Sequence, residues 1–290
     1  MAALTNQIAT ADVVEALDQE FIANFNGEMS RLTELLGIFA PEVVAAGTAM
    51  YQYTVTGSLD TTSVAEGDEV PLSKYEVDKT PIGEHTMKPY RKLVTAQSIA
   101  KAGFENAVLR TDRQMVKDIR KGILDGFFTF LATGTGSATG EGLQAALAQA
   151  DAKLADELEK NGDAADRIIH FVNHYDIADY LAKANVTTQT VFGMTYLKDF
   201  LGVTDIFVTN KVAKGTVYAT PVENIHVYGI DFAALGDAGL SYTVQDDGLL
   251  GVHHEPNYTR TSSETYALVG CDLLAEVKNY IVKATVTDPQ

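Results

Sequence analysis

Two stretches decide the fold of this chain: MYQYTVT at residues 50–56 and EHTMKPYRKLVT at residues 84–95. Both alternate their side chains with the period of two that is typical of β-strands. About thirty residues, mostly polar, acidic or glycine, separate them, although a hairpin normally closes with a short turn. A long loop costs entropy and has no core of its own to offset that cost. We therefore expect a two-stranded excursion that becomes ordered by lying on a neighbouring copy of the same chain.

An amphipathic helix follows this excursion. Residues 95–103 are expected to form a short connector, and Asp112 is a suitable N-cap for the helix. Beyond the helix, the glycine-rich residues 133–140 are expected to form a flexible linker. The apolar residues of the helix recur at spacings of three and four, which predicts one continuous buried stripe. They are Met115, Val116, Ile119, Ile123, Leu124, Phe127, Phe128 and Leu131.

The N-terminal residues 11–38 also have helical periodicity, but they do not form a self-contained unit. Phe21, Phe25, Leu32 and Leu36 lie on one apolar stripe of this segment. We therefore expect an N-terminal arm that docks on an adjacent subunit or on another part of its own chain.

The middle of the chain alternates helical and strand patterns, which is typical of a compact α/β lobe with a central sheet. The last part, residues 248–287, is rich in strand-forming residues. The predicted elements of the lobe are helices at 143–158 and 176–183 and strands at 168–172, 206–209, 216–220 and 225–229.

Composition limits the possible functions. The chain of 290 residues is 46% hydrophobic and 21% charged, which is typical of a folded protein with a sizeable core. Its net charge of −17 argues against a reader of nucleic-acid sequence, which normally carries a basic patch. Cys271 is the only cysteine, so no disulfide within the chain is possible. We expect neither a signal peptide nor a membrane span.

Candidate catalytic motifs are weak. The stretch GTGSATGEG at residues 134–142 lacks the Lys and Ser/Thr of a phosphate-binding loop and follows a helix, not a strand. His226, His253 and His254 are conceivable metal ligands, but adjacent histidines on a strand point to opposite faces. Cys271 has the context of a small core residue, and no pair of carboxylates is singled out for acid–base chemistry. A metal-dependent enzyme that uses the three histidines stays open as an alternative, while the main interpretation assigns no catalytic residue, metal or cofactor.

The order of these pieces resembles the major capsid proteins of tailed bacteriophages, which have the Hong Kong 97-type fold. Two strings resemble those of siphophage capsid proteins: LVTAQSIAKAG at residues 93–103 and GVHHEPNY at residues 251–258. The resemblance implies an α+β fold with an N-terminal arm, an extended loop, a peripheral domain built on a long spine helix, and an axial domain. The corresponding ranges are 1–46 for the arm, 47–93 for the extended loop, 94–140 and 245–290 for the peripheral domain, and 141–244 for the axial domain.

This resemblance implies a structural protein of the virion, not an enzyme. Copies of it would assemble in the host cytoplasm into pentamers and hexamers of an icosahedral shell around double-stranded DNA, without a membrane. Implied partners are a separate scaffolding protein, the portal and head-completion proteins, and DNA that is contacted non-specifically. An encapsulin-type nanocompartment shell is an alternative with the same fold. The residues expected at assembly interfaces are Phe21, Phe25, Leu32, Leu36, Glu66, Asp68, Glu69, Lys74, Lys79, Arg91 and Lys92.

Some relatives also crosslink a lysine of the extended loop to an asparagine of a neighbouring subunit, with a glutamate as the base. The resemblance places Lys74 and Lys79 in the matching loop and Asn257 and Asn279 in the matching domain. Most members of the family form no such bond.

Overall fold

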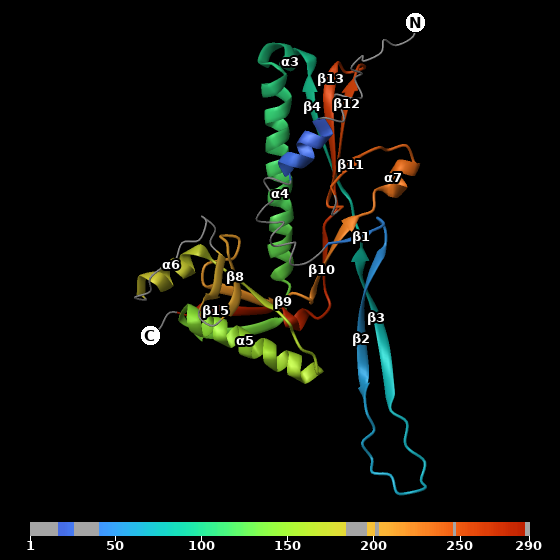
Figure 1. Cartoon of the computed structure of the whole chain (residues 1–290), viewed down its shortest axis with the longest axis vertical. Helices are drawn as coiled ribbons and strands as arrows, with labels where there is room; N and C mark the ends of the chain where they lie inside the picture. Colours follow the sequence, from blue (N-terminus) through green and yellow to red (C-terminus); the bar gives the residue numbers. More distant parts are fainter. Residues whose placement is uncertain (1–16, 26–40, 184–195, 201–202, 246–247, 288–290) are drawn as a thin grey trace.

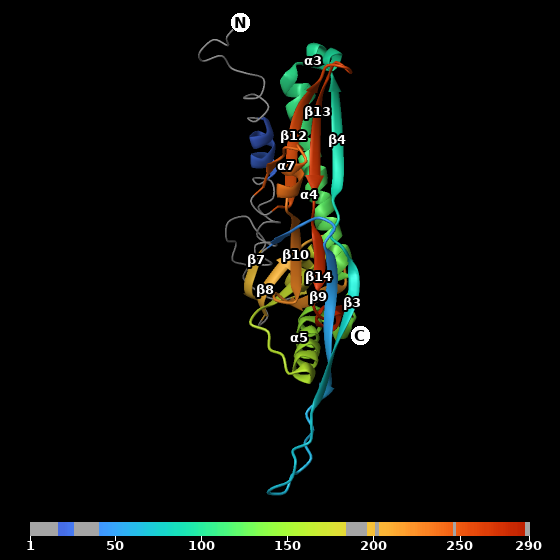
Figure 2. The ribbon, with the colours of Figure 1, turned by 90° about the vertical axis from the view of Figure 1, so that its right-hand side faces the viewer.

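The computed structural model describes residues 17–25, 41–183, 196–200, 203–245 and 248–287. The molecule is elongated, with a long helix and its sheet at one end, a second lobe near the middle, and a two-stranded hairpin that projects from the other end (Figure 1). Turned by 90°, it is narrow, so these parts form a thin plate (Figure 2). None of the described helices combines the length and the apolar character needed to cross a lipid bilayer.

The long helix α4, Arg110–Leu131, confirms the predicted amphipathic helix. Its apolar stripe is buried, as Val116 and Phe127 illustrate with exposed fractions of 1% each. Asp112 does not cap the helix, because α4 already begins at Arg110 and Asp112 lies within its first turn. A π-helix, Glu105–Leu109, leads directly into α4. The connector expected before it is another helix, α3, Ala96–Ala102, whose first turn is capped by the Thr95 hydroxyl.

A four-stranded antiparallel sheet packs beside α4 in the order β11-β12-β13-β4. Strand β13 lies between β12 and β4, which brings residues 88–95 and 250–257 into one sheet although they are far apart in sequence. The four strands are β4 (Lys88–Thr95), β11 (Thr243–Val244), β12 (Leu250–Asn257) and β13 (Ser262–Val269).

The second lobe contains a six-stranded mixed sheet in the order β5-β15-β9-β6-β8-β7. Helix α5, Gly142–Asn161, buries Leu147 and Leu154 against one face of this sheet. Phe127 and Phe128 of α4 contact Phe171 of β6, with ring centroids 5.6 and 5.7 Å away, so the two lobes share one core. The predicted helices at 143–158 and 176–183 and the predicted strands at 168–172, 206–209 and 216–220 are confirmed, whereas the predicted strand at 225–229 belongs to another sheet. Besides α5, the elements of this lobe are β5 (Gly136–Glu141), β6 (Ile168–Val172), α6 (His174–Lys183), β7 (Tyr196–Phe200), β8 (Val203–Val208), β9 (Thr216–Pro221) and β15 (Val282–Thr287).

The glycine-rich stretch after α4 is not a flexible linker. Residues 136–141 form β5, which pairs in parallel with β15. Its glycines permit a close approach, because a Cβ added at Gly140 would lie 2.3 Å from the backbone nitrogen of Ala146 in α5. The prediction of a linker was wrong because glycine marks close packing as well as turns.

A three-stranded sheet connects the two lobes, in the order β1-β10-β14. The strands of one sheet do not all come from one of the domain ranges expected from the sequence. Strand β15 and strand β5 belong to the lobe of residues 141–244, although the ranges 245–290 and 94–140 assign them to the peripheral domain. The remaining elements are β1 (Glu42–Val44), β10 (Ile225–Ile230), α7 (Ala233–Asp237), β14 (Asp272–Ala275) and the 3-10 helix Lys278–Tyr280.

The projecting hairpin pairs β2, Ala49–Ser58, with β3, Lys74–Glu84. The first predicted arm is confirmed, but the second is wrong, because residues 88–95 pair with β13 in the sheet beside α4. The connection between the arms is residues 59–73, about half the expected length. At the base, His85 exchanges backbone hydrogen bonds with Gly47 and Thr48, each of 2.9 Å. Its buried ring lies 2.8 Å from the Asp272 carboxylate, which fixes the hairpin to β14.

Candidate assembly surfaces

The β2–β3 hairpin has one apolar face and one polar face. In the antiparallel register Tyr53 lies opposite Lys79, Val55 opposite Val77, and Gly57 opposite Tyr75. Side chains two residues apart share a face, so all of these residues lie on the same side of the hairpin, and we call this side the hairpin face. The opposite side carries Gln52, Thr56, Ser58, Lys74, Glu76, Asp78 and Thr80.

The hairpin face is uncovered. Tyr53, Val55, Tyr75 and Val77 have exposed fractions of 61%, 63%, 53% and 63%. The same alternation in a globular protein would put these side chains in a core. The ring of Tyr75 lies against Gly57, which leaves no room there for a larger residue. The hairpin therefore has the pattern of a half-buried sheet that lacks the layer which should cover it.

The predicted lysines of the hairpin make local contacts. The Lys79 ammonium lies 3.6 Å from the centre of the Tyr51 ring and 5.6 Å from that of Tyr53. Lys74 forms an ion pair with Glu76 on the same strand. Both contacts are exposed, so they contribute little to stability in the single chain. Their role in assembly stays a prediction.

The tip of the hairpin, residues 59–73, is both apolar and acidic. Leu72, Val70 and Leu59 have exposed fractions of 95%, 72% and 69%. The predicted interface residues Glu66, Asp68 and Glu69 are exposed as well. Within the tip, the Asp60 carboxylate accepts hydrogen bonds from the hydroxyl and backbone NH of Thr62, which lower the pKa of Asp60. Among the described residues, no second layer covers this tip.

Arg91 and Lys92 make their polar contacts within the chain. Arg91 Nε donates to Glu264 at 2.9 Å, and the Tyr266 hydroxyl donates to the same carboxylate. The Asn257 amide donates to its other oxygen at 2.9 Å. The hydrogen bond from Tyr266, together with those from Arg91 and Asn257, lowers the pKa of Glu264 in spite of its desolvation.

Lys92 belongs to a separate network at the start of α4. Its ammonium donates to the Thr111 hydroxyl at 2.9 Å and to the Val108 carbonyl at 3.2 Å, and it forms an ion pair with Asp112. Because Val108 lies in the π-helix, Lys92 binds a carbonyl of a turn with irregular hydrogen bonding. The predicted roles of Arg91 and Lys92 in contacts between copies are neither supported nor contradicted by these internal contacts.

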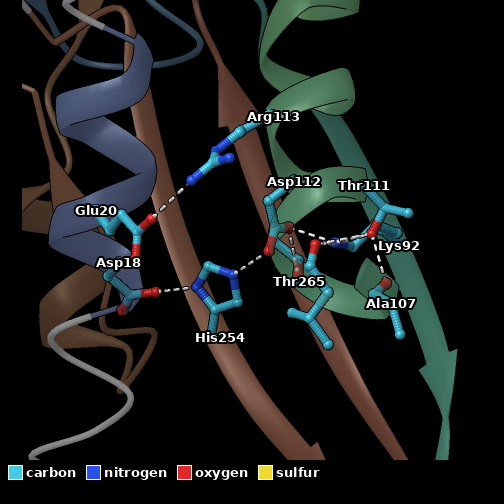
Figure 3. A network of polar contacts seen from close by, with 10 residues as sticks. Asp18, Glu20, Lys92, Ala107, Thr111, Asp112, Arg113, His254 and Thr265 are labelled. Carbon is cyan, nitrogen blue, oxygen red and sulfur yellow. Dashed lines mark hydrogen bonds and ion pairs between the residues drawn. The ribbon is translucent and has the colours of Figure 1, made fainter. Parts of the chain in front are cut away.

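The N-terminal segment 17–25 is helical and docks on its own chain. Phe21 and Phe25 have exposed fractions of 2% and 0%, and they belong to the core cluster that contains Val116 and Ile119 of α4. Asp18 of the segment lies beside His254 of β12, and Glu20 faces Arg113 of α4 at 3.6 Å (Figure 3). Leu32 and Leu36, which were predicted on the same stripe, lie outside the described residues.

The alternative of a metal-dependent enzyme lacks a site among the described residues. No three His, Cys, Asp or Glu side chains are arranged there to hold a metal ion. His226 pairs with Glu276 at 2.9 Å, whereas His254 lies between Asp18 and Asp112. Burial raises the pKa of Cys271 to about 12, so this thiol is not a nucleophile at neutral pH.

Known structures resemble this chain in the path of the backbone and not in sequence. No family model matches the sequence, and no curated protein matches it. Among solved structures, the capsid of cyanophage A-1(L) matches with a TM-score of 0.57 and 12% identity, covering 89% of this chain and 93% of that chain. The capsid of cyanophage P-SCSP1u matches with a TM-score of 0.56 and 7% identity, covering 87% of each chain.

An encapsulin has the same architecture. The SrpI encapsulin of Synechococcus elongatus matches with a TM-score of 0.52 and 10% identity, covering 88% of this chain and 87% of that chain. Sequence identity is low in each case, so these likenesses concern the arrangement of the backbone. They confirm the prediction from the sequence: this chain has the α+β, Hong Kong 97-type fold of phage capsid proteins.

Proposed function

We propose that this chain is the major capsid protein of a tailed bacteriophage, a structural subunit that assembles with copies of itself into pentamers and hexamers of an icosahedral shell. The observation that carries the proposal is the uncovered hairpin face on a chain with a capsid fold. A two-stranded hairpin alone is at best marginally stable in water. An apolar face of this kind marks a surface that binds another protein. In a shell, a neighbouring copy of the chain would cover it.

Burial of the hairpin face would drive the association. Each large apolar side chain contributes roughly 1.5–3 kcal/mol when it passes from full exposure to full burial. The side chains of the face are only partly exposed, so each contributes part of this amount. Every subunit of a closed shell both gives and receives such a contact, and many modest contacts together make the shell stable.

The remaining partners follow from this function. Double-stranded DNA would fill the shell without sequence-specific contacts, because the net charge of −17 repels phosphates on average. A separate scaffolding protein, a portal and head-completion proteins would complete the particle in the host cytoplasm. The chain would act in the virion as a building element and not as an enzyme.

An encapsulin-type compartment is a second candidate, because the SrpI encapsulin has a similar backbone. The two functions differ in what the shell holds. Particles isolated from the source organism would contain double-stranded DNA in the first case and a cargo enzyme in the second. Genes for a portal and a terminase beside the gene for this chain would favour the first, and a gene for a cargo enzyme would favour the second.

Electron microscopy of the purified full-length chain tests the proposal directly. We expect rings and closed shells, formed alone or with the cognate scaffolding protein. The matched variant Val77→Asp places a charge on the hairpin face and should leave folded subunits that do not close into shells. A wild-type chain that stays monomeric at high concentration, with the scaffolding protein present, would contradict the proposal.

A further inference from the structure

The imidazole of His254 is buried between two carboxylates that belong to different parts of the chain. Its Nδ1 lies 2.5 Å from Asp18 Oδ1 on the N-terminal segment, and its Nε2 lies 3.5 Å from Asp112 Oδ2 on α4. The three residues form a line across the contact between the segment and α4 (Figure 3). The side chains of all three are at most 8% exposed. This arrangement joins the N-terminal segment to the long helix through one ring.

The geometry favours the imidazolium form. A neutral histidine carries a proton on one ring nitrogen and a lone pair on the other. Here both nitrogens face a carboxylate oxygen, so a neutral ring would direct a lone pair at one carboxylate. Only the imidazolium carries a proton on both nitrogens: Nδ1 is within hydrogen-bond distance of Asp18, and Nε2 makes an ion pair with Asp112 without hydrogen-bond geometry.

The charges around the ring also balance in this form. Asp18 and Asp112 carry two negative charges, while His254 and Lys92 supply two positive charges. Loss of the proton leaves one buried negative charge without compensation, which is costly in a site from which water is excluded. The hydroxyls of Thr265 and Thr243 donate to Asp112 at 3.1 Å and to Asp18 at 3.3 Å, but hydroxyls carry no charge.

Other charged groups lie at the edge of this cluster. His253 Nδ1 is 4.0 Å from Asp18 Oδ2, and its side chain is one-third exposed. Glu20 and Arg113 form their pair with each side chain about half exposed. Solvent screens these edge groups, so they influence the docking of the segment less than His254 does.

We propose that His254 is a proton-dependent latch: its imidazolium form fastens residues 17–25 to α4 and to strand β12, and loss of its proton releases this segment. The ring of Phe21 packs edge-on against the imidazole at 6.0 Å, so movement of Asp18 away from His254 also uncovers an apolar contact. The latch is a property of the single chain, and it holds whether or not the chain forms shells.

The pKa of His254 agrees with this direction. Burial lowers it, but the hydrogen bonds and charges of Asp112 and Asp18 outweigh burial, and the net result is a pKa raised above 6.5. A raised pKa in the docked state means that the stabilisation is complete below about pH 6.5 and is lost as the pH rises through the higher value. The segment should therefore dock tightly at mildly acidic pH and loosen at alkaline pH.

Hydrogen exchange of the full-length chain at several pH values tests the latch. Rates corrected for the intrinsic effect of pH give the protection of residues 17–25, and peptides of α5 report on the fold. We expect protection of the segment to fall about tenfold or more between about pH 6 and pH 9, while α5 stays protected. Protection that does not change with pH in the wild-type chain would overturn the proposal.

Substitutions test whether the pH dependence comes from the imidazole of His254. His254→Gln should remove the pH dependence, and His253→Gln, its exposed neighbour, should retain it. Asp18→Asn leaves the imidazole in place, and it should lower the protection at about pH 6 and flatten the profile. Asp18→Asn tests the proposal if His254→Gln fails to fold. A pH dependence that persists in His254→Gln or in Asp18→Asn would overturn the assignment.

Discussion

Strands β3 and β9 have opposite surroundings in one molecule. Every residue of β3, Lys74–Glu84, is exposed, whereas every residue of β9, Thr216–Pro221, is buried. Strand β9 has a neighbour on each side, β15 and β6, while β3 pairs with β2 alone among the strands that the structure describes. Backbone pairing thus produces a strand in both places, but only β9 receives stability from a core. The hairpin therefore lacks a core of its own among the described residues.

The largest expected effect comes from a charge in the shared core. Phe127→Asp places a carboxylate beside Phe171, at a position that is 1% exposed, without a partner. We expect a loss of about 4 kcal/mol or more, enough to unfold the chain, because an unpaired buried charge is among the most destabilising changes. Denaturant unfolding and solubility measure it, with the exposed Lys121→Ala as the control. A soluble Phe127→Asp chain that unfolds cooperatively would show that the two lobes do not depend on this contact.

A smaller effect is expected from the glycine that β5 places against α5. Gly140→Ala should destabilise by about 1–3 kcal/mol, because the added carbon meets backbone atoms that cannot move aside. Gly126→Ala on α4 is the matched control, since an added carbon there has open space. It should stabilise the helix by up to about 1 kcal/mol. Thermal unfolding of both variants measures the contrast, and equal shifts would contradict the close packing of β5.

The smallest effect on stability is expected on the hairpin itself. Val77→Asp should change the free energy of unfolding by less than about 0.5 kcal/mol, because the side chain is 63% exposed and touches no core. The same charge buried in an interface between copies would be costly, so assembly should fail. Chemical denaturation and electron microscopy on one preparation separate the two results. Normal shells from Val77→Asp would remove the hairpin face from the assembly mechanism.

The helices and strands that follow from local periodicity were predicted from the sequence. The stripe from Val116 to Leu131 repeats every three or four residues, and α4 buries these residues as expected. Strand β3 was not predicted, although its apolar residues, Tyr75 and Val77, alternate with the charged residues Glu76 and Asp78. This alternation was itself the signal of a two-faced strand. The segment was interpreted as a polar loop because it contains no continuous apolar run.

The network around His254 could not be predicted, because its members are remote in sequence. Asp18 and His254 are 236 positions apart, and no periodicity connects them. One signal was present: Asp112 falls on the buried stripe of α4, four residues before Val116. A carboxylate at such a position needs a partner of opposite charge, and Lys92 and His254 supply it. The identity of those partners required the three-dimensional arrangement.

The position of β15 has a consequence for the timing of synthesis. This strand, at residues 282–287, lies between β5 and β9 inside the six-stranded sheet. During translation it leaves the ribosome after all the other described elements, so the sheet has a gap until then. Because domains fold as units and contacts between remote residues form slowly, the second lobe is completed only after β15 has been synthesised. A nascent chain that still lacks β15 therefore leaves the facing edges of β5 and β9 unpaired, and unpaired strand edges can pair with the wrong chain.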